Sequence, residues 1–505
     1  MAFAGWDSCG GWVYGIDMLF SQLIEQAGIN AALEGGDVEV DCVRFKSTRC
    51  RKGCCFVAFR GTLSDGHDFI PDALARGASA VVCQESSRAN GIVPFAVVDD
   101  SRSATGKLAQ AITGWPSRKL KCVGITGTNG KTTVSYMIDA ILDRAGLKRG
   151  LLGTIAYRAG GQQMPAGTTT PDPVRLAEMI SQMVSAGQTH LVMEVSSHAL
   201  DQGRTAGIDF DVAVFTNLSG DHLDYHGDMD SYLSAKLRLF EHLQPSARAV
   251  VNADDENGRR FADACAAPVV WYGLDKPADV TAEVDELGPA RCLFTLIAGQ
   301  ERAKVSVPVI GRHNVQNCLA AAAAANALGI DTATIADALE GLQQVPGRLQ
   351  SVGGDSYSVY VDYAHTDDAL HNVLSSLRPI VKGRIILVFG CGGDRDRSKR
   401  PRMAAVAEKL CDRIVITSDN PRSEPPEEII SEIASGLSQS GKAKAEIEPD
   451  RRAAIELAIA QAKPADAVLI AGKGHEKYQI VGNRKIDFDD VQVAAEAIDE
   501  REDQQ

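Results

Sequence analysis

The sequence lacks a long apolar run and is short of positive charge. No stretch approaches the roughly 18 consecutive apolar residues that a membrane-spanning helix needs. Its first twenty residues have no cationic start followed by an apolar core, so no secretory leader is expected. The 52 lysines and arginines are outnumbered by 66 aspartates and glutamates, for a net charge of −14. That balance argues against nucleic-acid binding, which normally uses a basic face. We therefore expect a cytoplasmic protein without membrane insertion and with small-molecule partners.

Zinc-site spacing is also lacking, although the chain has twelve cysteines. Cys50, Cys54 and Cys55 stand close together. They have neither the companion cysteine pair nor the histidine spacing of a zinc site. Buried or incidental thiols in a reducing compartment are the favoured interpretation.

The length of 505 residues excludes a single core, because cores stop growing at about 250–300 residues. A prior of roughly 150 residues per domain gives about three domains. The turn-forming residues 114–117 and 345–347 are the natural breaks. The predicted domains are 1–117, 118–346 and 347–505.

Apolar runs alternate with helical stretches, which favours an α/β fold with mostly parallel sheets. Several runs are apolar at every position, as in strands buried on both faces. Ligands of such sheets bind at the carboxyl ends of the strands, so the loops that follow are the expected functional sites. Strands are expected at 54–59, 80–83, 122–125, 191–195, 212–216, 249–252, 385–389, 413–417 and 467–471, and helices at 134–145 and 318–328.

The segment GTNGKTT follows an apolar strand and opens a helix, which is the context of a phosphate-binding loop. Gly127 and Gly130 let backbone N–H groups turn toward phosphate oxygens, and the helix N-terminus adds positive potential. Lys131 can bridge the outer phosphates, and the Thr132 hydroxyl is placed to bind Mg²⁺. The usual first glycine of such loops is Ile125 here. The alternative is a glycine-rich turn with a solvated lysine. The predicted ATP-binding residues of the loop are Gly127, Thr128, Asn129, Gly130, Lys131, Thr132 and Thr133.

This form of the loop resembles that of Mur ligases and folylpolyglutamate synthetases, and the chain from residue 121 onward resembles the Mur ligases most strongly. The resemblance implies a small α/β N-terminal domain for a uridine nucleotide, a central ATPase domain and a C-terminal Rossmann-like domain for an amino acid. It implies a monomeric ligase of peptidoglycan precursor synthesis, and hence a role in cell-wall biogenesis, cell shape and cell division. ATP is the expected co-substrate and Mg²⁺ the expected cofactor.

Two polar residues end neighbouring strands. Glu194 and His222 are sensible Mg²⁺ ligands near a triphosphate, although either one alone is more often an ordinary polar residue at a strand end. The resemblance implies that they bind magnesium together with Thr132, and that Lys236 is carbamylated and helps to hold a second ion. The alternative is an unmodified Lys236 on an exposed helix face. The predicted catalytic residues are Lys131, Glu194, His222 and Lys236.

The nucleotide base and the muramyl substrate have their own predicted residues. Asn317 is expected at adenine, because an amide presents a donor and an acceptor together. The other ATP contacts implied by the resemblance are His313, Asn314, Arg348 and Asp362. The muramyl substrate is expected at Ser47, Thr62, Leu63, Ser64, Thr169, Thr170, Ser196, Gln202 and Arg204. Around Ser47 the chain reads Lys-Ser-Thr, where family members usually have Asp-Ser-Arg.

The amino acid that is added depends on charge. Diaminopimelate carries a carboxylate that lysine lacks, and the planar fork of arginine binds a carboxylate with two parallel hydrogen bonds. The segment DNPR, ending in Arg422, resembles the motif of the diaminopimelate-adding members of the family. Arg395 is a second candidate, and Glu476 suits the distal ammonium. The full predicted set is Arg395, Asp419, Asn420, Pro421, Arg422, Gly472 and Glu476.

The expected reaction is amide formation through an acyl phosphate, with ADP and phosphate released. One alternative is the same ligation with L-lysine or another diamino acid. A second alternative, from a different class, is a non-catalytic ATP-binding regulator. The substrate loops present beside the ATP loops disfavour it.

Overall fold

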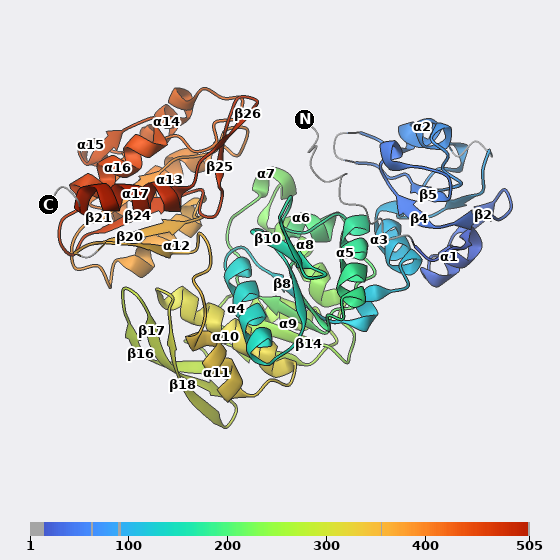
Figure 1. Ribbon diagram of the computed structural model, residues 1–505, viewed down its shortest axis with the longest axis horizontal. Helices are drawn as coiled ribbons and strands as arrows, with labels where there is room; N and C mark the ends of the chain where they lie inside the picture. The colour runs from blue at the N-terminus through green and yellow to red at the C-terminus, as the bar shows by residue number, and fades with distance from the viewer. Residues whose placement is uncertain (1–14, 62–63, 89–91, 355, 503–505) are drawn as a thin grey trace.

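The computed structural model describes residues 15–61, 64–88, 92–354 and 356–502, and it contains three main sheets that are covered by helices (Figure 1). The N-terminal part and the C-terminal part lie on opposite sides of the central part (Figure 1). The predicted divisions at 117/118 and 346/347 fall between these sheets. Within the described ranges, no helix is both long enough and apolar enough to cross a membrane.

The N-terminal part has a five-stranded sheet that is parallel except at one edge, where β2 pairs antiparallel with β7. In spatial order its strands are β2 (Ala32–Glu34), β7 (Phe95–Val97), β6 (Ala80–Cys83), β5 (Cys54–Val57) and β4 (Cys42–Arg44). A small pair of strands, β1 (Met18–Leu19) and β3 (Glu39–Val40), lies beside it. The helices are α1 (Phe20–Gln26), α2 (Ile70–Ala75) and α3 (Ser101–Ile112).

The central part has an eleven-stranded sheet. Its middle strands, in the spatial order β9-β12-β8-β13-β14-β15-β16, pair in parallel, and the pairs beyond them at both ends are antiparallel. In spatial order these are β11 (Gln162–Pro165), β10 (Ala156–Ala159), β9 (Arg149–Leu152), β12 (His190–Glu194), β8 (Lys121–Thr126), β13 (Val212–Phe215), β14 (Arg248–Asn252), β15 (Val269–Tyr272), β16 (Val280–Leu287), β17 (Cys292–Ala298) and β18 (Glu301–Val307). The helices are α4 (Lys131–Arg144), α5 (Pro173–Ser185), α6 (Ser197–Asp201), α7 (Leu223–His226), α8 (Met229–Glu241), α9 (Gly258–Asp263), α10 (Arg312–Ala327) and α11 (Thr332–Glu340).

The central sheet is buried on both faces because successive side chains of a strand point to opposite sides. Along β12, Val192 belongs to the core that includes α4 and α10, whereas Leu191 and Met193 belong to the core that includes α5 and α8. Helix α10 packs closely against the sheet because its alanines from 320 to 325 are small and buried. Because the central strands are parallel, their carboxyl ends lie along the same edge of the sheet.

The C-terminal part has a six-stranded sheet, parallel except for the β19–β20 pair. In spatial order its strands are β19 (Gln350–Gly353), β20 (Ser358–Asp362), β24 (Ala467–Ala471), β21 (Ile385–Phe389), β22 (Arg413–Ile416) and β23 (Ala445–Ile447). The helices are α12 (Asp367–Leu377), α13 (Lys399–Leu410), α14 (Pro426–Ser435), α15 (Gln439–Ala443), α16 (Arg451–Gln461) and α17 (Asp490–Glu502), and a hairpin is formed by β25 (Tyr478–Val481) and β26 (Arg484–Asp487).

The predicted α/β class is confirmed, and all nine predicted strands are present. The strands at 80–83, 385–389 and 467–471 have the predicted bounds. The two predicted helices begin earlier than expected. Helix α4 starts at Lys131 and α10 at Arg312, because their first turns are polar and an apolar pattern does not mark them. The antiparallel strands β10, β11 and β16 to β18 had no corresponding prediction.

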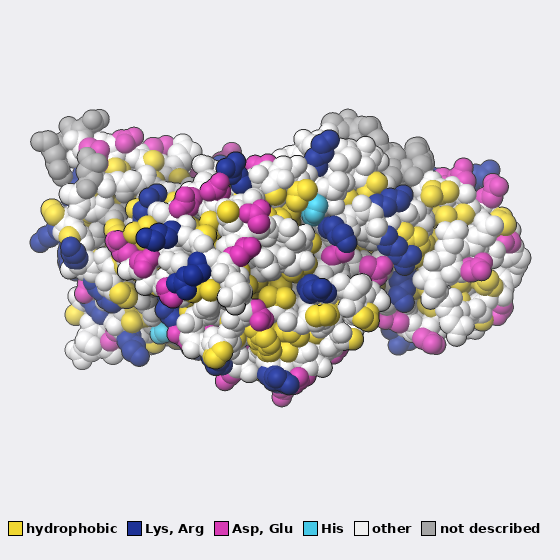
Figure 2. Space-filling model, turned by 90° about the horizontal axis from the view of Figure 1, so that it is seen from below, with side chains coloured by type: hydrophobic (Ala, Val, Ile, Leu, Met, Phe, Trp, Pro, Cys, Tyr) yellow, Lys and Arg dark blue, Asp and Glu magenta, His cyan; other side chains and the backbone are white. Residues whose placement is uncertain are grey.

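The surface and the thiols agree with the composition. Acidic and basic side chains are interspersed over most of the face seen in Figure 2. The thiols of Cys54 and Cys55 are buried, and that of Cys50 is half-buried, with its sulfur 3.7 Å from Cys54 Sγ. In the described part of the chain every cysteine is a free thiol.

Candidate active site

A cavity of about 470 Å³ lies at the carboxyl ends of the central strands, next to α10 and to the loop after β20. It is lined by residues from distant parts of the sequence, including most of those predicted to contact ATP or magnesium. The predicted residues that line it are Thr128, Asn129, Gly130, Lys131, Thr132, Thr133, Thr169, Glu194, Ser196, His222, Lys236, His313, Asn314, Asn317, Arg348 and Asp362.

The phosphate loop keeps its shape because two glycines occupy positions that no other residue fits. Gly127 and Gly130 have φ of +147° and +86°, in the region that L side chains avoid. A Cβ on Gly127 would lie 1.9 Å from Thr216 Oγ1, and one on Gly130 would lie 2.5 Å from Asn317 Oδ1. The loop therefore lies directly against α10 and against Thr216, the residue that follows β13.

Lys131 is turned back onto its own loop. Its Nζ donates to the carbonyl oxygens of Gly127 and Thr128, each at 2.8 Å. Burial lowers the pKa of Lys131, while Glu194 raises it. The ammonium is thus held by neutral acceptors that a phosphate oxygen can replace.

Glu194 is a buried carboxylate, only 1% exposed, that is held by hydroxyl and amide donors. It accepts hydrogen bonds from Thr132 Oγ1 at 3.0 Å and from Thr154 N and Oγ1 at 2.7 and 3.0 Å. Among the described residues, no lysine or arginine forms an ion pair with it. A buried, hydrogen-bonded carboxylate that has no ion-pair partner and lies beside a hydroxyl fits a magnesium site, since Mg²⁺ prefers oxygen ligands.

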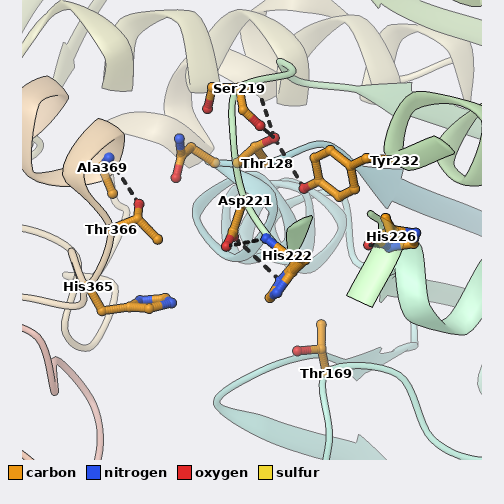
Figure 3. Close-up of polar contacts among 12 residues, drawn as sticks. Thr128, Thr169, Ser219, Asp221, His222, His226, Tyr232, His365, Thr366 and Ala369 are labelled. Carbon is orange, nitrogen blue, oxygen red and sulfur yellow. Dashed lines mark hydrogen bonds and ion pairs between the residues drawn. The ribbon is translucent and has the colours of Figure 1, made fainter. Parts of the chain in front are cut away.

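His222 lines the same cavity as Glu194 and lies in the loop between β13 and α7, in a left-handed backbone conformation with φ of +55°. Asp221 accepts from the His222 backbone N–H at 2.8 Å, and its other oxygen lies 3.4 Å from His222 Nε2 (Figure 3). Burial lowers the pKa of His222 to about 4. The imidazole is therefore neutral at physiological pH, which is the form that binds a metal.

Lys236 is buried, with 1% exposed, so the alternative of a lysine on an exposed helix face is wrong. Its Nζ donates to the Gly127 carbonyl oxygen at 2.8 Å and lies 4.3 Å from the centre of the Tyr232 ring. Burial, and then the positive charge of Lys131, lower the pKa of Lys236 well below its ordinary value. Within the described ranges, no three His, Cys, Asp or Glu side chains gather as a metal cluster; the predicted magnesium site depends instead on a hydroxyl, one carboxylate, one imidazole and this lysine.

The predicted muramyl-binding residues of the central part form one hydrogen-bonded group. Thr170 Oγ1 donates to the Glu194 carbonyl oxygen at 2.8 Å and accepts from Ser196 N at 3.1 Å. Arg204 donates to the Thr170 carbonyl oxygen at 2.9 Å and to Gln202 Oε1. Thr169 lies 3.2 Å from Thr154, next to Glu194. Thr169 and Ser196 of this group line the cavity, whereas Thr170, Gln202 and Arg204 do not.

The predicted uridine-binding residues lie elsewhere. Ser47 is buried in a short 3₁₀ helix (Ser47–Arg49) of the N-terminal part and does not line the cavity. Ser64 is exposed, and Thr62 and Leu63 lie outside the described residues.

The predicted amino-acid site is a second group, at the carboxyl ends of β21, β22 and β24. Asn420 Nδ2 donates to Glu476 Oε2 at 2.8 Å, and Arg422 Nη1 donates to the Gly393 carbonyl oxygen at 2.7 Å. A Cβ on Gly472 would lie 2.6 Å from Asp419 Oδ2. None of the seven predicted residues lines the cavity; Arg395 and Pro421 lie in the same two loops. Tyr363, which does line the cavity, packs 5.0 Å from the ring of His475 and so connects the two groups.

Three residues of the site had no prediction. Lys473 is fully buried and donates to Glu476 Oε2 at 3.2 Å, so it neutralises that carboxylate. Asp368 of α12 accepts from Asn129 Nδ2 at 2.9 Å and Ser219 Oγ at 2.6 Å, which joins the C-terminal part to the phosphate loop. Asp221 stands beside a predicted residue in the sequence, whereas Asp368 has no local signal.

Family models match most of the chain. A model described as Mur ligase family, catalytic domain, matches residues 39–112; the Mur ligase middle domain matches 125–325; and the Mur ligase, glutamate ligase domain, matches 347–474.

Individual proteins are similar over nearly their whole length. The UDP-N-acetylmuramoyl-L-alanyl-D-glutamate--2,6-diaminopimelate ligase of Geobacillus thermodenitrificans (strain NG80-2) is 44% identical over 92% of this chain and 96% of its own. The ligase of that name from Geobacter metallireducens is 45% identical over 94% and 97%. A solved structure with the same name superposes with a TM-score of 0.66 at 35% identity, covering 91% of this chain and 95% of the other.

Proposed function

The chain belongs to the Mur ligase family, and we propose that it joins meso-2,6-diaminopimelate to UDP-N-acetylmuramoyl-L-alanyl-D-glutamate in peptidoglycan precursor synthesis, converting ATP to ADP and phosphate. The observation that carries the proposal is the pairing of two sites. One cavity gathers the phosphate loop with Glu194, His222 and Lys236, and its Tyr363 packs against His475. Glu476, next to His475, accepts a hydrogen bond from Asn420 of the Arg422 loop.

The reaction follows from this arrangement in two steps. The γ-phosphoryl group of ATP passes to the side-chain carboxylate of D-glutamate, which gives an acyl phosphate and ADP. An amine of diaminopimelate then attacks the acyl carbon, phosphate leaves and the amide forms. Catalysis of this kind depends on positioning and on charge neutralisation rather than on a protein nucleophile. Lys131, now on loop carbonyls, would turn to the phosphates when ATP binds.

We assign the magnesium ligands to Thr132, Glu194, His222 and carbamylated Lys236. Bound magnesium supplies neutralisation of the phosphate charge. Glu194 supports the assignment, because it is buried and forms no ion pair with a lysine or arginine of the described residues. The low pKa of Lys236 favours its neutral amine, the form that reacts with carbon dioxide.

The substrates are assigned to the surrounding loops. ATP binds along residues 127–133, with its base at Asn317 and further contacts from His313, Asn314, Arg348 and Asp362. The uridine end binds the N-terminal part at Ser47, Thr62, Leu63 and Ser64, and the muramyl peptide binds Thr169, Thr170, Ser196, Gln202 and Arg204. We further propose a monomer that acts in the cytoplasm.

The amino-acid preference separates this proposal from its closest alternative. Ligation of L-lysine needs no cation for a distal carboxylate, and the Arg422 side chain lies in the loop where such a carboxylate is expected. The half-buried guanidinium, held at Gly393, supports diaminopimelate.

The test is a product assay with purified protein, ATP, Mg²⁺ and the muramyl dipeptide nucleotide, comparing meso-diaminopimelate with L-lysine at equal concentrations. Amide formation with diaminopimelate and little with L-lysine is the expected result. Preferential use of L-lysine would overturn the substrate assignment, and ATP binding with neither product would indicate the regulator instead.

A further inference from the structure

A fully buried arginine lies behind the amino-acid loops. Arg400 of α13 is 0% exposed and forms two parallel hydrogen bonds to Glu424, Nη1 to Oε2 and Nη2 to Oε1, each 2.9 Å. Its Nη2 also lies 3.2 Å from the Gly392 carbonyl oxygen, and its Nη1 lies 2.8 Å from Glu432 Oε2. The fork of Arg400 thus holds both the loop after β21 and the loop after β22.

Glu424 extends this connection to the backbone of the first loop. Its Oε1 accepts from the Asp394 N–H at 2.6 Å. The Asp394 carboxylate in turn accepts from Ser423 Oγ at 2.6 Å and from Ser423 N at 3.2 Å. Loop 392–395 carries Arg395, and loop 419–424 carries Arg422. The two loops are therefore joined next to both predicted carboxylate-binding arginines.

Both loops contain backbone conformations that need such support. Asp394 and Arg422 have φ of +53° and +52°, which non-glycine residues adopt at a cost. Strained positions of this kind persist only where surrounding contacts fix them. Packing is also close: a Cβ on Gly393 would lie 1.9 Å from the Pro421 carbonyl oxygen. The Arg422 backbone is also held by β25, since its N–H donates to the Ile480 carbonyl oxygen and its carbonyl oxygen accepts from the Gly482 N–H. Arg400 and Glu424 add the contact to loop 392–395.

We propose that Arg400 and Glu424 are positioning residues that fix the two amino-acid loops against each other, so that Arg422 and Arg395 present their guanidinium groups to the distal carboxylate of the amino acid. The inference rests on the proposed function and names residues that act through others. The pKa of Glu424 is lowered to about 2, chiefly by its hydrogen bonds from Arg400. The pair therefore stays ionised throughout the pH range of an assay.

A second ion pair of the same sheet provides a matched control. Arg384 donates Nε and Nη2 to Asp466 Oδ2 at 3.0 and 2.6 Å. It precedes β21 and so lies at the opposite end of the strand from loop 392–395. Loss of this pair removes a comparable contact without touching either amino-acid loop.

The experiment compares steady-state kinetics of Glu424→Gln, Arg400→Lys and Ser423→Ala with those of Arg384→Met. Misplaced guanidinium groups lose charge-assisted hydrogen bonds to the distal carboxylate, which corresponds to roughly 10- to 100-fold in binding, so we expect the KM for diaminopimelate to rise about 10- to 100-fold in the first two variants. Ser423→Ala loses one hydroxyl contact on an exposed side chain and should show a rise of about threefold. The KM for ATP should change in none of them, and Arg384→Met should keep every KM while its melting temperature falls.

A double variant tests whether Glu424 acts through Arg422. In an Arg422→Ala background, Glu424→Gln should add much less than it does alone, because only Arg395 is left for it to position. Additive effects, or equal rises in the KM for ATP, would show a merely structural role and overturn the inference. If Arg400→Lys does not fold, Ser423→Ala and Glu424→Gln decide.

The two proposals fail in different ways. Absence of diaminopimelate ligation by the unaltered protein refutes the proposed function. Normal ligation by the unaltered protein, together with an unchanged KM in Glu424→Gln, refutes only the positioning role.

Discussion

The phosphate end and the amino-acid end of this protein are built in different ways. The phosphate loop uses glycines at its left-handed positions, Gly127 and Gly130, and it follows a strand that is buried on both faces. The amino-acid loops place Asp394 and Arg422, which are not glycines, in left-handed conformations. The ion pair between Arg400 and Glu424 joins these two loops. The first design is encoded locally, whereas the second depends on contacts between separate loops.

The difference predicts where substitutions act. A side chain added at either glycine of the phosphate loop would collide with Thr216 or Asn317, so the effect of such a change should be large and specific to ATP. A change behind the amino-acid loops should alter one substrate and leave the others, because ion pairs hold these loops from outside the binding surface.

The largest expected effect is that of Lys131→Ala. Removal of one preorganised donor from a site where charge develops costs about 100- to 1,000-fold in turnover, and we expect the upper end because Lys131 is the cation of the loop. Phosphate release in the complete reaction mixture measures it. An unchanged melting temperature is the control, and near-normal turnover would refute ATP chemistry at this loop.

Next comes Arg422→Ala, which tests the amino-acid end alone. Hydrogen bonds to charged groups contribute about 1.5–3 kcal/mol, which corresponds to roughly 10- to 100-fold in binding. We expect the KM for diaminopimelate to rise by that factor while L-lysine use stays as it was. Competition between the two amino acids measures the change, and equal losses for both would contradict carboxylate recognition.

Gly130→Ala tests how local the phosphate loop is. Its Cβ would meet Asn317 Oδ1 at 2.5 Å in a left-handed conformation, so we expect a loss of stability of about 1–3 kcal/mol together with weaker ATP binding. Gly161→Ala is the matched control, because Gly161 has φ of +79° but no atom within 4 Å of its Cβ position. That variant should lose about 1 kcal/mol and bind ATP normally. Thermal unfolding with and without ATP separates the two effects.

The smallest effect is on pH dependence at the amino-acid end. Hydrogen bonds from Arg400 lower the pKa of folded Glu424 to about 2, well below the ordinary value of a glutamate. A depressed carboxyl pKa contributes stability that is present above the unfolded value and is lost as pH falls through the folded one. The gap in melting temperature between the unaltered protein and Glu424→Gln should therefore be full above about pH 5 and shrink toward pH 2. A gap that is constant over this range would contradict the ionised pair.

Sequence patterns predicted the strands because a strand buried on both faces must be apolar at every position. Strands β21 and β24 therefore have the predicted bounds. The same reasoning failed for the start of α10, whose first turn carries polar residues toward the cavity instead of apolar ones toward the core. Residue type alone would place Lys236 on the surface, and its burial in contact with Gly127 excludes that alternative.

What the sequence by itself determined is the phosphate loop and the strand ends that carry Glu194, His222 and Arg422, since each depends on a few neighbouring residues. Tertiary structure alone decided how these are supported. Asp368 reaches Asn129 across 239 positions of the chain, and Arg400 meets Glu424 only because α13 packs beside the loop after β22. No recurring spacing or periodicity in the sequence marks such pairs, because folding and not chain connectivity brings the two side chains together. A sequence pattern records local geometry, and these contacts are not local.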